Sequence, residues 1–463
     1  MSQQSETPFS AGTQLFTVTN TQAYHYYRLV TDQLTGNGAT LSLAEWGIFG
    51  TPEGINVTSD GRVGVGVVNP KQALEVAGNA VFGGNISAGN LGMFRNRIIN
   101  GDMRIDQRNN GVTVTGITNS VPYITDRFSI PLTSHFTISA SRDTDCPLGF
   151  TNSLQITNGT GVTIAPAQYL HIQHKIEGLN ISDFNYGTSY ATPIVVSFYA
   201  KTSISNSIYA ISLRNFNGTR SYVTNFTIQN ANIWTYITLT IPGDTAGIWN
   251  SNTSTGLILT ISLTTGSDFQ IIDSNIGIWS SGNYTGFPSN TSFGATTGAI
   301  FKFTGVQLEK GTLATPFEFR PYPIELQLCF RYHFQIKRWS DTLPNDAYIG
   351  KTNAANGSAA VCEITLPVPM RTTPTILYSN GSTNGTTTTL VESTTNISTD
   401  VFAFGTGPST ITFINAPDSG TSVSSLGPTR IRLYMTGTFT AGYSWEMFAF
   451  RNINKSFAVT AEL

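Results

Sequence analysis

Residues 194–244 read IVVSFYAKTSISNSIYAISLRNFNGTRSYVTNFTIQNANIWTYITLTIPGD. Apolar and polar side chains alternate within this stretch in several short runs, which is the period of strands that bury one face. Ser, Asn and Gly separate the runs, and these residues favour turns. Turn signals at intervals of about 8–12 residues are typical of β-sandwiches. The stretch therefore predicts consecutive strands of a sandwich.

The same alternation extends over residues 93–322. Further strand-like runs are LQITNG (154–159), YLHIQHKIEG (169–178), LILTISLTTGS (257–267) and FKFTGVQLEKG (301–311). Eight or more such strands fit a jelly roll. We therefore expect residues 93–322 to form one jelly-roll β-sandwich.

The composition indicates an all-β, multidomain protein. The chain has 463 residues, including 44 Gly and 20 Pro; 11% are aromatic and 11% are charged. Disordered chains are poor in aromatic residues and rich in charge, so this composition excludes disorder. Polar, uncharged residues mixed with Val, Ile, Phe and Tyr are typical of short strands joined by tight turns.

Charge and hydropathy exclude two classes of partner. The 25 Lys and Arg against 27 Asp and Glu give a net charge of -2, without the basic stripe that nucleic-acid binding requires. No apolar run approaches the roughly 18 residues of a membrane span, so we expect no membrane insertion. The N-terminal MSQQSETPFS lacks a signal-peptide pattern. The widely separated Cys146, Cys329 and Cys362 favour synthesis in a reducing compartment.

Residues 51–92 have a different character. They include GRVGVGVVNPKQALEVAGN (61–79), in which Val63, Val65 and Val67 alternate with glycine. Strands this short bury too little apolar surface to be stable alone. They become stable when several copies of the chain pair around an axis and cover one another's edges. The segment therefore predicts a glycine-rich β shaft in a homotrimer, with a monomeric linker as the alternative.

The pattern changes again after the sandwich. Residues 323–340 mix helical and strand spacing, which predicts a short helix around Pro323–Arg331 that runs into a strand and links two domains. Residues 341–463 return to strand-like runs, with a long polar stretch at 380–400. We expect a small C-terminal β domain there, at the tip of the protein.

A series of motifs resembles a known kind of protein. NRIINGDMRIDQRNNG (96–111), QHKIEGLNISDFNYGT (173–188) and TGVQLEKGTLATPFEFRPYPIELQLCFRY (304–332) occur in this order. They resemble a module of bacteriophage tail fibres, especially cyanophage tail fibres, that is also found in large algal viruses. The resemblance implies a virion protein, made in the host cytoplasm, that mediates attachment to the host surface.

Two N-terminal stretches resemble other elements. FTVTNTQAYHYYRLV (16–30) and LSLAEWGIFG (41–50) resemble the last strands of a discoidin-type domain. This implies that residues 1–50 form a β segment that anchors the chain to other virion proteins. Residues 51–92 resemble a glycine-rich element of viral and phage fibre shafts, which agrees with the trimer inferred above.

The histidines do not form a metal-binding motif. His171 and His174 are three residues apart in a strand, so their side chains should point to opposite faces, and no H-E-x-x-H helix occurs. Structural or surface roles are favoured over metal ligation for His25, His135, His171, His174 and His333. We predict no metal site and no cofactor.

Calcium is a weaker alternative, suggested by resemblance to jelly-roll carbohydrate-binding modules. Such modules often hold a structural ion between the first strand and a late acidic strand. Here Thr304 and Gly305 stand where carboxylate ligands would be needed. Asp102 and Glu309 remain the weak candidates.

Catalysis is not predicted. Glycosidases need two carboxylates facing each other across the scissile bond. Each acidic pair in this sequence lies near a turn, where side-chain capping or solvation explains it: Asp102 with Asp106, Asp143 with Asp145, and Glu177 with Asp183. A polysaccharide-cleaving tailspike remains the alternative function.

Aromatic residues in turn-rich segments are the candidate binding residues. Sugars are held by aromatic rings that stack on their apolar faces, while amides and hydroxyls bond to their OH groups. Trp279, Tyr284, Trp339 and Tyr348 are the main candidates, with Trp249 and Tyr443 as further ones. Core packing is the competing interpretation for each. The sequence thus predicts a fibre that binds host cell-surface glycans, with a purely structural decoration protein as another alternative.

Overall fold

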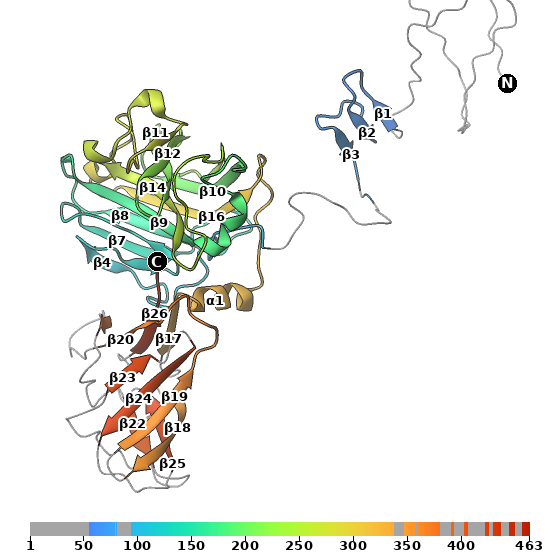
Figure 1. The fold of residues 1–463 in the computed structure, drawn as a ribbon. Helices are drawn as coiled ribbons and strands as arrows, with labels where there is room; N and C mark the ends of the chain where they lie inside the picture. The colour runs from blue at the N-terminus through green and yellow to red at the C-terminus, as the bar shows by residue number, and fades with distance from the viewer. Residues whose placement is uncertain are drawn as a thin grey trace, which may run out of the picture. The chain divides into compact units, whose positions relative to one another are not determined.

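The computed structural model divides the chain into two compact units, Met1–Ser87 and Ala88–Leu463 (Figure 1). In the first unit it describes residues 55–78 and 80. In the second it describes residues 94–337 without a gap, and then 347–356, 359–379, 390–392, 402–405, 422–425, 429–436, 444–449 and 456–463. The predicted anchoring segment 1–50 lies outside the described residues.

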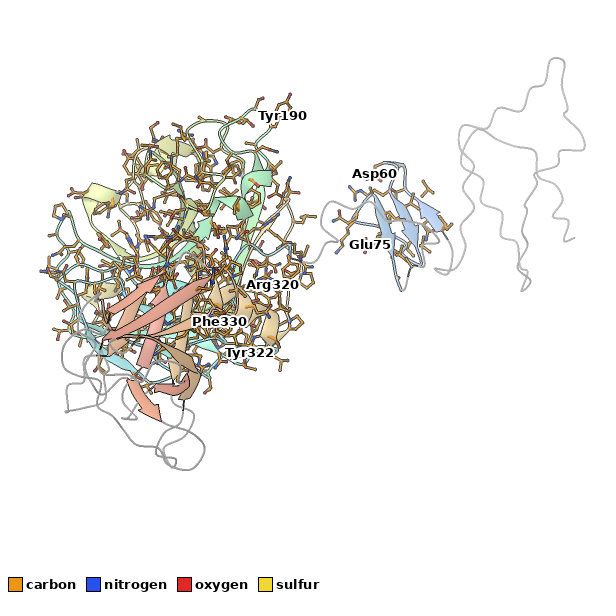
Figure 2. The ribbon with its side chains drawn as sticks, turned by 60° about the horizontal axis from the view of Figure 1, so that its bottom comes forward. Asp60, Glu75, Tyr190, Arg320, Tyr322 and Phe330 are labelled. Carbon is orange, nitrogen blue, oxygen red and sulfur yellow. The ribbon has the colours of Figure 1, made fainter. Side chains whose placement is uncertain are left out.

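The first unit contains a three-stranded sheet, which Asp60 and Glu75 mark in Figure 2. Its strands are β1 (Ile55–Val57), β2 (Val63–Val65) and β3 (Leu74–Val76). β1 pairs antiparallel with β2, and β2 pairs parallel with β3. The sheet leaves apolar side chains in solvent, since Ile55 is 71% exposed and Leu74 is 55% exposed. The strands are as short as the sequence predicted.

The body of the second unit contains two large sheets whose strand pairs are all antiparallel. Sheet 1 has the order β13-β10-β16-β8-β7-β4, and sheet 2 has the order β15-β12-β11-β14-β9-β6-β5 (Figure 1). The strands of sheet 1 are β4 (Val114–Ile117), β7 (Ile138–Asp143), β8 (Ser153–Asn158), β10 (Ile194–Thr202), β13 (Thr235–Ile241) and β16 (Ile300–Lys310). Those of sheet 2 are β5 (Tyr123–Thr125), β6 (Phe128–Ser129), β9 (Tyr169–Glu177), β11 (Ser207–Asn215), β12 (Arg220–Ile228), β14 (Thr255–Thr265) and β15 (Trp279–Ser281).

Aromatic side chains join the two sheets. Phe198 of β10 and Phe226 of β12 have ring centroids 5.1 Å apart, and Tyr209 of β11 lies 5.2 Å from Phe301 of β16. All four are buried. Complete burial of one such side chain contributes about 1.5–3 kcal/mol. These contacts confirm the predicted all-β sandwich.

Among the described residues, five short 3-10 turns lie in three of the connections, β9–β10, β14–β15 and β15–β16. They are η1 (Gly178–Asn180), η2 (Ser182–Phe184), η3 (Ser267–Phe269), η4 (Asp273–Asn275) and η5 (Phe293–Ala295).

A helix follows the sandwich, as the sequence predicted. α1 spans Tyr322–Phe330 and is followed by β17 (His333–Lys337). Glu325 of the helix pairs with Arg320 at 3.2 Å and accepts a hydrogen bond from the backbone N–H of Asn100. Arg320, Tyr322 and Phe330 are labelled in Figure 2. Because Arg320 and Glu325 are both buried, the helix is packed on the body and is not a free linker.

The C-terminal region is also built from antiparallel strands. One sheet has the order β17-β26-β20-β21 and the other has the order β22-β25-β18-β19-β24-β23. The strands are β18 (Ala347–Asn356), β19 (Ala359–Thr365), β20 (Thr375–Ser379), β21 (Leu390–Glu392), β22 (Phe402–Gly405), β23 (Ser422–Ser425), β24 (Arg430–Thr436), β25 (Ser444–Ala449) and β26 (Ser456–Thr460). No helix within the described residues is long and apolar enough to cross a membrane.

Candidate functional site

The outer face of sheet 1 carries large aromatic and charged side chains. Successive residues of a strand point to opposite faces. In β10, Phe198 and Ala200 belong to the core, so Tyr199 and Lys201 point away from it. Tyr199 stands directly opposite Tyr236 of β13, and their ring centroids are 4.8 Å apart. The two tyrosines therefore form a cross-strand pair on the side of sheet 1 that faces away from sheet 2.

Three phenylalanines from two other segments, one before β8 and one after β16, extend this pair into an aromatic patch. Phe150 lies 5.6 Å from Tyr199 and 5.2 Å from both Phe317 and Phe319, measured between ring centroids. Phe319 is 53% exposed and Tyr236 is 45% exposed. The patch thus presents aromatic surface to solvent at both ends.

A glycine makes room for the patch. Gly305 in β16 has φ +65°, and a Cβ atom there would lie 2.7 Å from Cζ of Phe150 and 3.2 Å from Cδ2 of Tyr199. The pairing of β10 with β16 shifts register between Ser197 and Tyr199. A side chain at position 305 would occupy the space of both rings, so the glycine is required for their approach.

A polar pocket of about 170 Å³ lies on the same sheet. Trp234 stands two residues before Tyr236, and its ring centroid is 5.5 Å from Nζ of Lys201, one of the pocket residues. Charged, amide and hydroxyl side chains predominate among the lining residues, which are Asp145, Gln155, Lys201, Thr202, Ser203, Asn232, Ile300 and Lys302. The pocket and the aromatic patch therefore share strand β10.

Asp145 organises the charges of the pocket. Its carboxylate accepts hydrogen bonds from Lys201 Nζ at 2.6 Å, Lys302 Nζ at 2.9 Å and Trp234 Nε1 at 3.1 Å. Partial burial raises the pKa of Asp145, but these three donors outweigh it and lower that pKa to about 2. Lys302 also bonds to Asp143 at 3.0 Å. The Asp145 side chain is nevertheless 41% exposed, so an ionised carboxylate is held in place and open to solvent.

This combination suits a ligand with both apolar and hydroxyl surfaces. Exposed aromatic rings can stack on apolar C–H faces. A fixed carboxylate accepts hydrogen bonds, and the amides of Gln155 and Asn232 can both donate and accept them. Small numbers of placed polar groups beside apolar surface are the usual composition of a ligand site.

Two of the predicted tryptophans come together elsewhere in the body. Trp279 begins β15, and its ring lies 5.5 Å from Trp249 and 5.8 Å from Tyr186. Its indole N–H donates to the carbonyl of Pro242 at 2.7 Å, and that of Trp249 donates to Ala246 at 3.2 Å. Both indoles pack against the core, so the structure gives each a packing role. Their glycan-binding role stays a prediction.

Among the other predicted aromatic residues, the structure describes the side chain of Tyr284. Tyr284 packs against a small cluster on sheet 2 that includes Ala210 and Val223. Tyr348 belongs to β18, but its side chain is outside what the structure describes. Trp339 and Tyr443 lie outside the described residues. The sequence analysis did not single out Tyr199, Tyr236, Phe150, Phe317, Phe319 or Trp234.

The two weak calcium candidates are held by protein groups. Glu309 is buried and accepts hydrogen bonds from the N–H of Thr315 at 2.8 Å and from Gln307 Nε2 at 3.0 Å. Asp102 forms an ion pair with Arg104; burial raises the pKa of Asp102, and the guanidinium opposes that rise. Within the described residues, no three metal-ligating side chains of the His, Cys, Asp or Glu type cluster together.

The predicted acidic pairs have identifiable structural partners. Asp106 accepts hydrogen bonds from the backbone N–H groups of Asn109 and Gly111, which confirms a turn-capping role. Asp143 and Asp145 share Lys302. In the remaining pair, each carboxylate binds a different cation: Glu177 pairs with Arg331 at 2.6 Å, and Asp183 pairs with Arg97 at 2.9 Å.

His171 and His174 lie on opposite faces of β9, as predicted. His174 packs in the interior, with its ring 4.9 Å from that of Phe128. His171 lies on the other side and is within 3.3 Å of the hydroxyls of Thr265 and Thr285. Burial lowers the pKa of both rings well below the usual value, so both are neutral near pH 7.

Comparisons with known proteins give weak likenesses to solved structures. No family model matches the chain, and no curated protein matches it. The enzymatically active domain of bacteriophage CBA120 tailspike protein 4 is similar at 12% identity and a TM-score of 0.25, over 47% of this chain and 22% of that one. A putative sugar binding protein from Bacteroides thetaiotaomicron is similar at 11% identity and a TM-score of 0.25, over 47% of this chain and 100% of that one. The family 11 carbohydrate-binding module from Clostridium thermocellum is similar at 10% identity and a TM-score of 0.22, over 41% of this chain and 91% of that one.

The described residues thus define an all-β protein whose body is a β-sandwich. Its function has to be argued from the side chains of that body.

Proposed function

We propose that this chain is a glycan-binding protein, and that the aromatic patch and polar pocket of sheet 1 hold the sugar. The observation that carries the proposal is the cross-strand Tyr236–Tyr199 pair on β13 and β10, beside the carboxylate of Asp145, which follows β7 and is held by Lys201 of β10. In this arrangement the rings cover an apolar sugar face, and Asp145, Asn232 and Gln155 bond to its hydroxyls.

Titration of the full chain with oligosaccharides identified on a glycan array tests this site. Removing one stacking ring should weaken binding roughly tenfold, which corresponds to about 1.4 kcal/mol. We therefore expect Tyr236→Ala and Asp145→Asn each to lose affinity. Tyr190→Ala is the matched control, because Tyr190 is 80% exposed and projects from the body (Figure 2). Equal binding by wild type and Tyr236→Ala would remove sheet 1 as the site.

We further propose that the protein is a structural fibre of a virion, that it mediates host-surface attachment, and that it does so without catalysis. The ordered motifs described in the sequence support this assignment. Residues 1–50 would attach the chain to other virion proteins, and residues 341–463 would form the tip. Adsorption of the purified chain to host cells separates an attachment fibre from a purely structural decoration protein.

Trimerisation is part of the same proposal. The sheet β1–β3 exposes Ile55, Val57 and Leu74 by more than half of their surface. Three copies of the chain could cover these side chains, and three linked binding sites would multiply a weak glycan affinity through effective concentration.

Light scattering of the full chain tests the trimer. We expect three times the monomer mass for wild type and a lower mass for Val57→Asp, which puts a charge on β1. Val112→Asp is the control, because Val112 is similarly exposed in the second unit, at 58% against 69% for Val57. A stable wild-type monomer would contradict the trimer but leave the sugar site open.

The alternative of a depolymerising spike is tested by turnover. The carboxylates of the predicted acidic pairs are bound to cations or cap turns, which favours binding over hydrolysis. We expect incubation with a bound polysaccharide to yield no new reducing ends. Release of oligosaccharides would establish an enzyme instead.

A further inference from the structure

Three arginines are buried in the described part of the second unit, and they differ in their partners. Arg127 is 2% exposed and pairs with Glu462, and Arg320 is 7% exposed and pairs with Glu325. Arg214 of β11 is 8% exposed, and no carboxylate of a described residue lies within ion-pair distance of it. A buried charge without a counter-ion is costly, so this arginine calls for an explanation.

The guanidinium of Arg214 is only partly satisfied by its neighbours. One terminal nitrogen donates to Asn283 Oδ1, and the other donates to Thr260 Oγ1 at 3.3 Å. Its Nε has no partner, and neither does the buried hydroxyl of nearby Ser212. Since a guanidinium has five N–H donors, several remain for a further acceptor.

One further cation, Lys175, lies on the same face of sheet 2 as Arg214, and its Nζ donates to the carbonyl of Leu463 at 2.7 Å. On the outer face of sheet 2, Arg214 stands opposite Ile258 of β14, which stands opposite Lys175 of β9. Arg214 and Lys175 thus lie in one cross-strand row, two strands apart, and their backbones are about 10 Å from each other. Burial lowers the pKa of Arg214 to about 10, so the group still carries its charge near pH 7.

The group that covers Arg214 lies at the surface. Asn283 is exposed, and it belongs to the short segment that follows β15. Its amide oxygen occupies a position that an oxygen of an incoming anion could take over by rotation of the side chain. An anion from solvent can therefore reach Arg214 by displacing one neutral acceptor, the amide oxygen of Asn283.

We propose that the outer face of sheet 2 binds an oxyanion, namely the carboxylate or sulfate group of an acidic sugar, and that Arg214 is the group that recognises it. The planar fork of arginine matches two oxygens of such a group. Lys175 lies two strands away and bonds to Leu463, so Arg214 supplies the direct contact, and the hydroxyls of Ser212 and Thr260 lie on the same face of the sheet. The site lies on the sheet opposite to the aromatic patch, so it does not depend on the sugar site of sheet 1.

Titrations of the full chain at constant ionic strength test this site, with glucuronate, glucose 6-sulfate and glucose as the three ligands. We expect glucuronate or the sulfate ester to bind at least about tenfold more tightly than glucose. Arg214→Gln should remove that difference, and Arg214→Lys should keep part of it. Lys310→Gln is the charge-matched control, because Lys310 is a half-buried cation of sheet 1, where it contacts Asp183. Equal binding of all three ligands, or unchanged anion binding by Arg214→Gln, would overturn the proposal.

Asn283→Asp gives an independent test that keeps Arg214. It places a carboxylate where the amide oxygen now contacts the guanidinium, at an exposed position. We expect this variant to melt at a higher temperature than wild type and to bind glucuronate at least about tenfold more weakly, because the arginine is already occupied. Undiminished glucuronate binding by a folded Asn283→Asp variant would count against the proposal.

Discussion

The guanidinium carbon of Arg127 lies 3.5 Å from the centre of the Tyr332 ring. Arg127 also pairs with Glu462 and donates to the carbonyl of Lys175 at 2.6 Å. Ala461 donates its N–H to the carbonyl of Tyr332 at 2.7 Å. Residues from the start of the sandwich, from between α1 and β17, and from beyond β26 therefore meet at one buried cation, so the segment after β26 is packed against the body.

Glu462→Gln should destabilise the protein strongly. Arg127 is 1% exposed at its side chain and Glu462 is 10% exposed, so the substitution leaves a buried cation without its carboxylate. Breaking such a pair costs about 3–5 kcal/mol. Urea denaturation measures the loss. Asp183→Asn is the matched control, because its pair with Arg97 is exposed and should contribute less than about 1 kcal/mol. Equal losses of unfolding free energy in the two variants would show that the buried Arg127–Glu462 pair stabilises the protein no more than the exposed Arg97–Asp183 pair does.

Acidification should remove a stabilising contribution from the polar pocket. The pKa of Asp145 is about 2 in the folded protein against 3.8 for the free group, so the unfolded chain takes up this proton first. Its contribution is present above about pH 4 and is lost as the pH falls to about 2. Melting temperatures measured across this window should fall more steeply for wild type than for Asp145→Asn. If the melting temperatures of wild type and Asp145→Asn fell in parallel with pH, the ion pairs of Asp145 with Lys201 and Lys302 would not stabilise the protein.

Gly305→Ala should disturb the aromatic patch, whereas Gly298→Ala should not. Both glycines have a positive φ, near +65° and +68°, so each substitution carries a left-handed strain of about 1–2 kcal/mol. The new methyl group at 305 also meets Phe150 and Tyr199, while at 298 it meets no atom within 4 Å. We expect a larger loss of unfolding free energy for Gly305→Ala, with a changed near-ultraviolet circular dichroism signal from the tyrosines. Indistinguishable variants would show that the rings do not depend on this glycine.

Trp279→Ala separates packing from recognition. The indole packs on Trp249 and Tyr186 and bonds to Pro242, so its removal should cost about 2 kcal/mol or more. We expect the folded variant to keep the glycan affinity of wild type. Lost affinity with unchanged stability would instead confirm the sequence-based prediction that this residue binds sugar.

The fold was largely predictable because alternation and turn chemistry are local signals. The stretch 194–244 became β10 to β13, and the mixed spacing after residue 322 became α1 and β17. The strand β15 could not be recognised from the sequence, because the turn-rich residues around Trp279 predict a loop. β15 forms there because it pairs with β12, and that partner cannot be read from the local sequence.

The candidate site was less predictable because its parts come from distant segments. Tyr199 and Phe198 are adjacent aromatic residues, and the sequence does not say which of them faces the core. Phe150 and Phe319 join the patch from outside the strands. Trp234 and Tyr236, two residues apart, were the available signal, since period-two aromatic residues on an exposed strand share one face.

The central place of β16 in sheet 1 has a consequence for how the protein folds. Residues 300–310 lie between β10, residues 194–202, and β8, residues 153–158. Until the ribosome has released this last strand of the body, β8 and β10 have no common neighbour, and the unpaired N–H and C=O groups along their edges stay open to misassociation. Contacts so far apart along the chain also close slowly. The patch and its pocket should therefore be among the last parts of the body to form during synthesis.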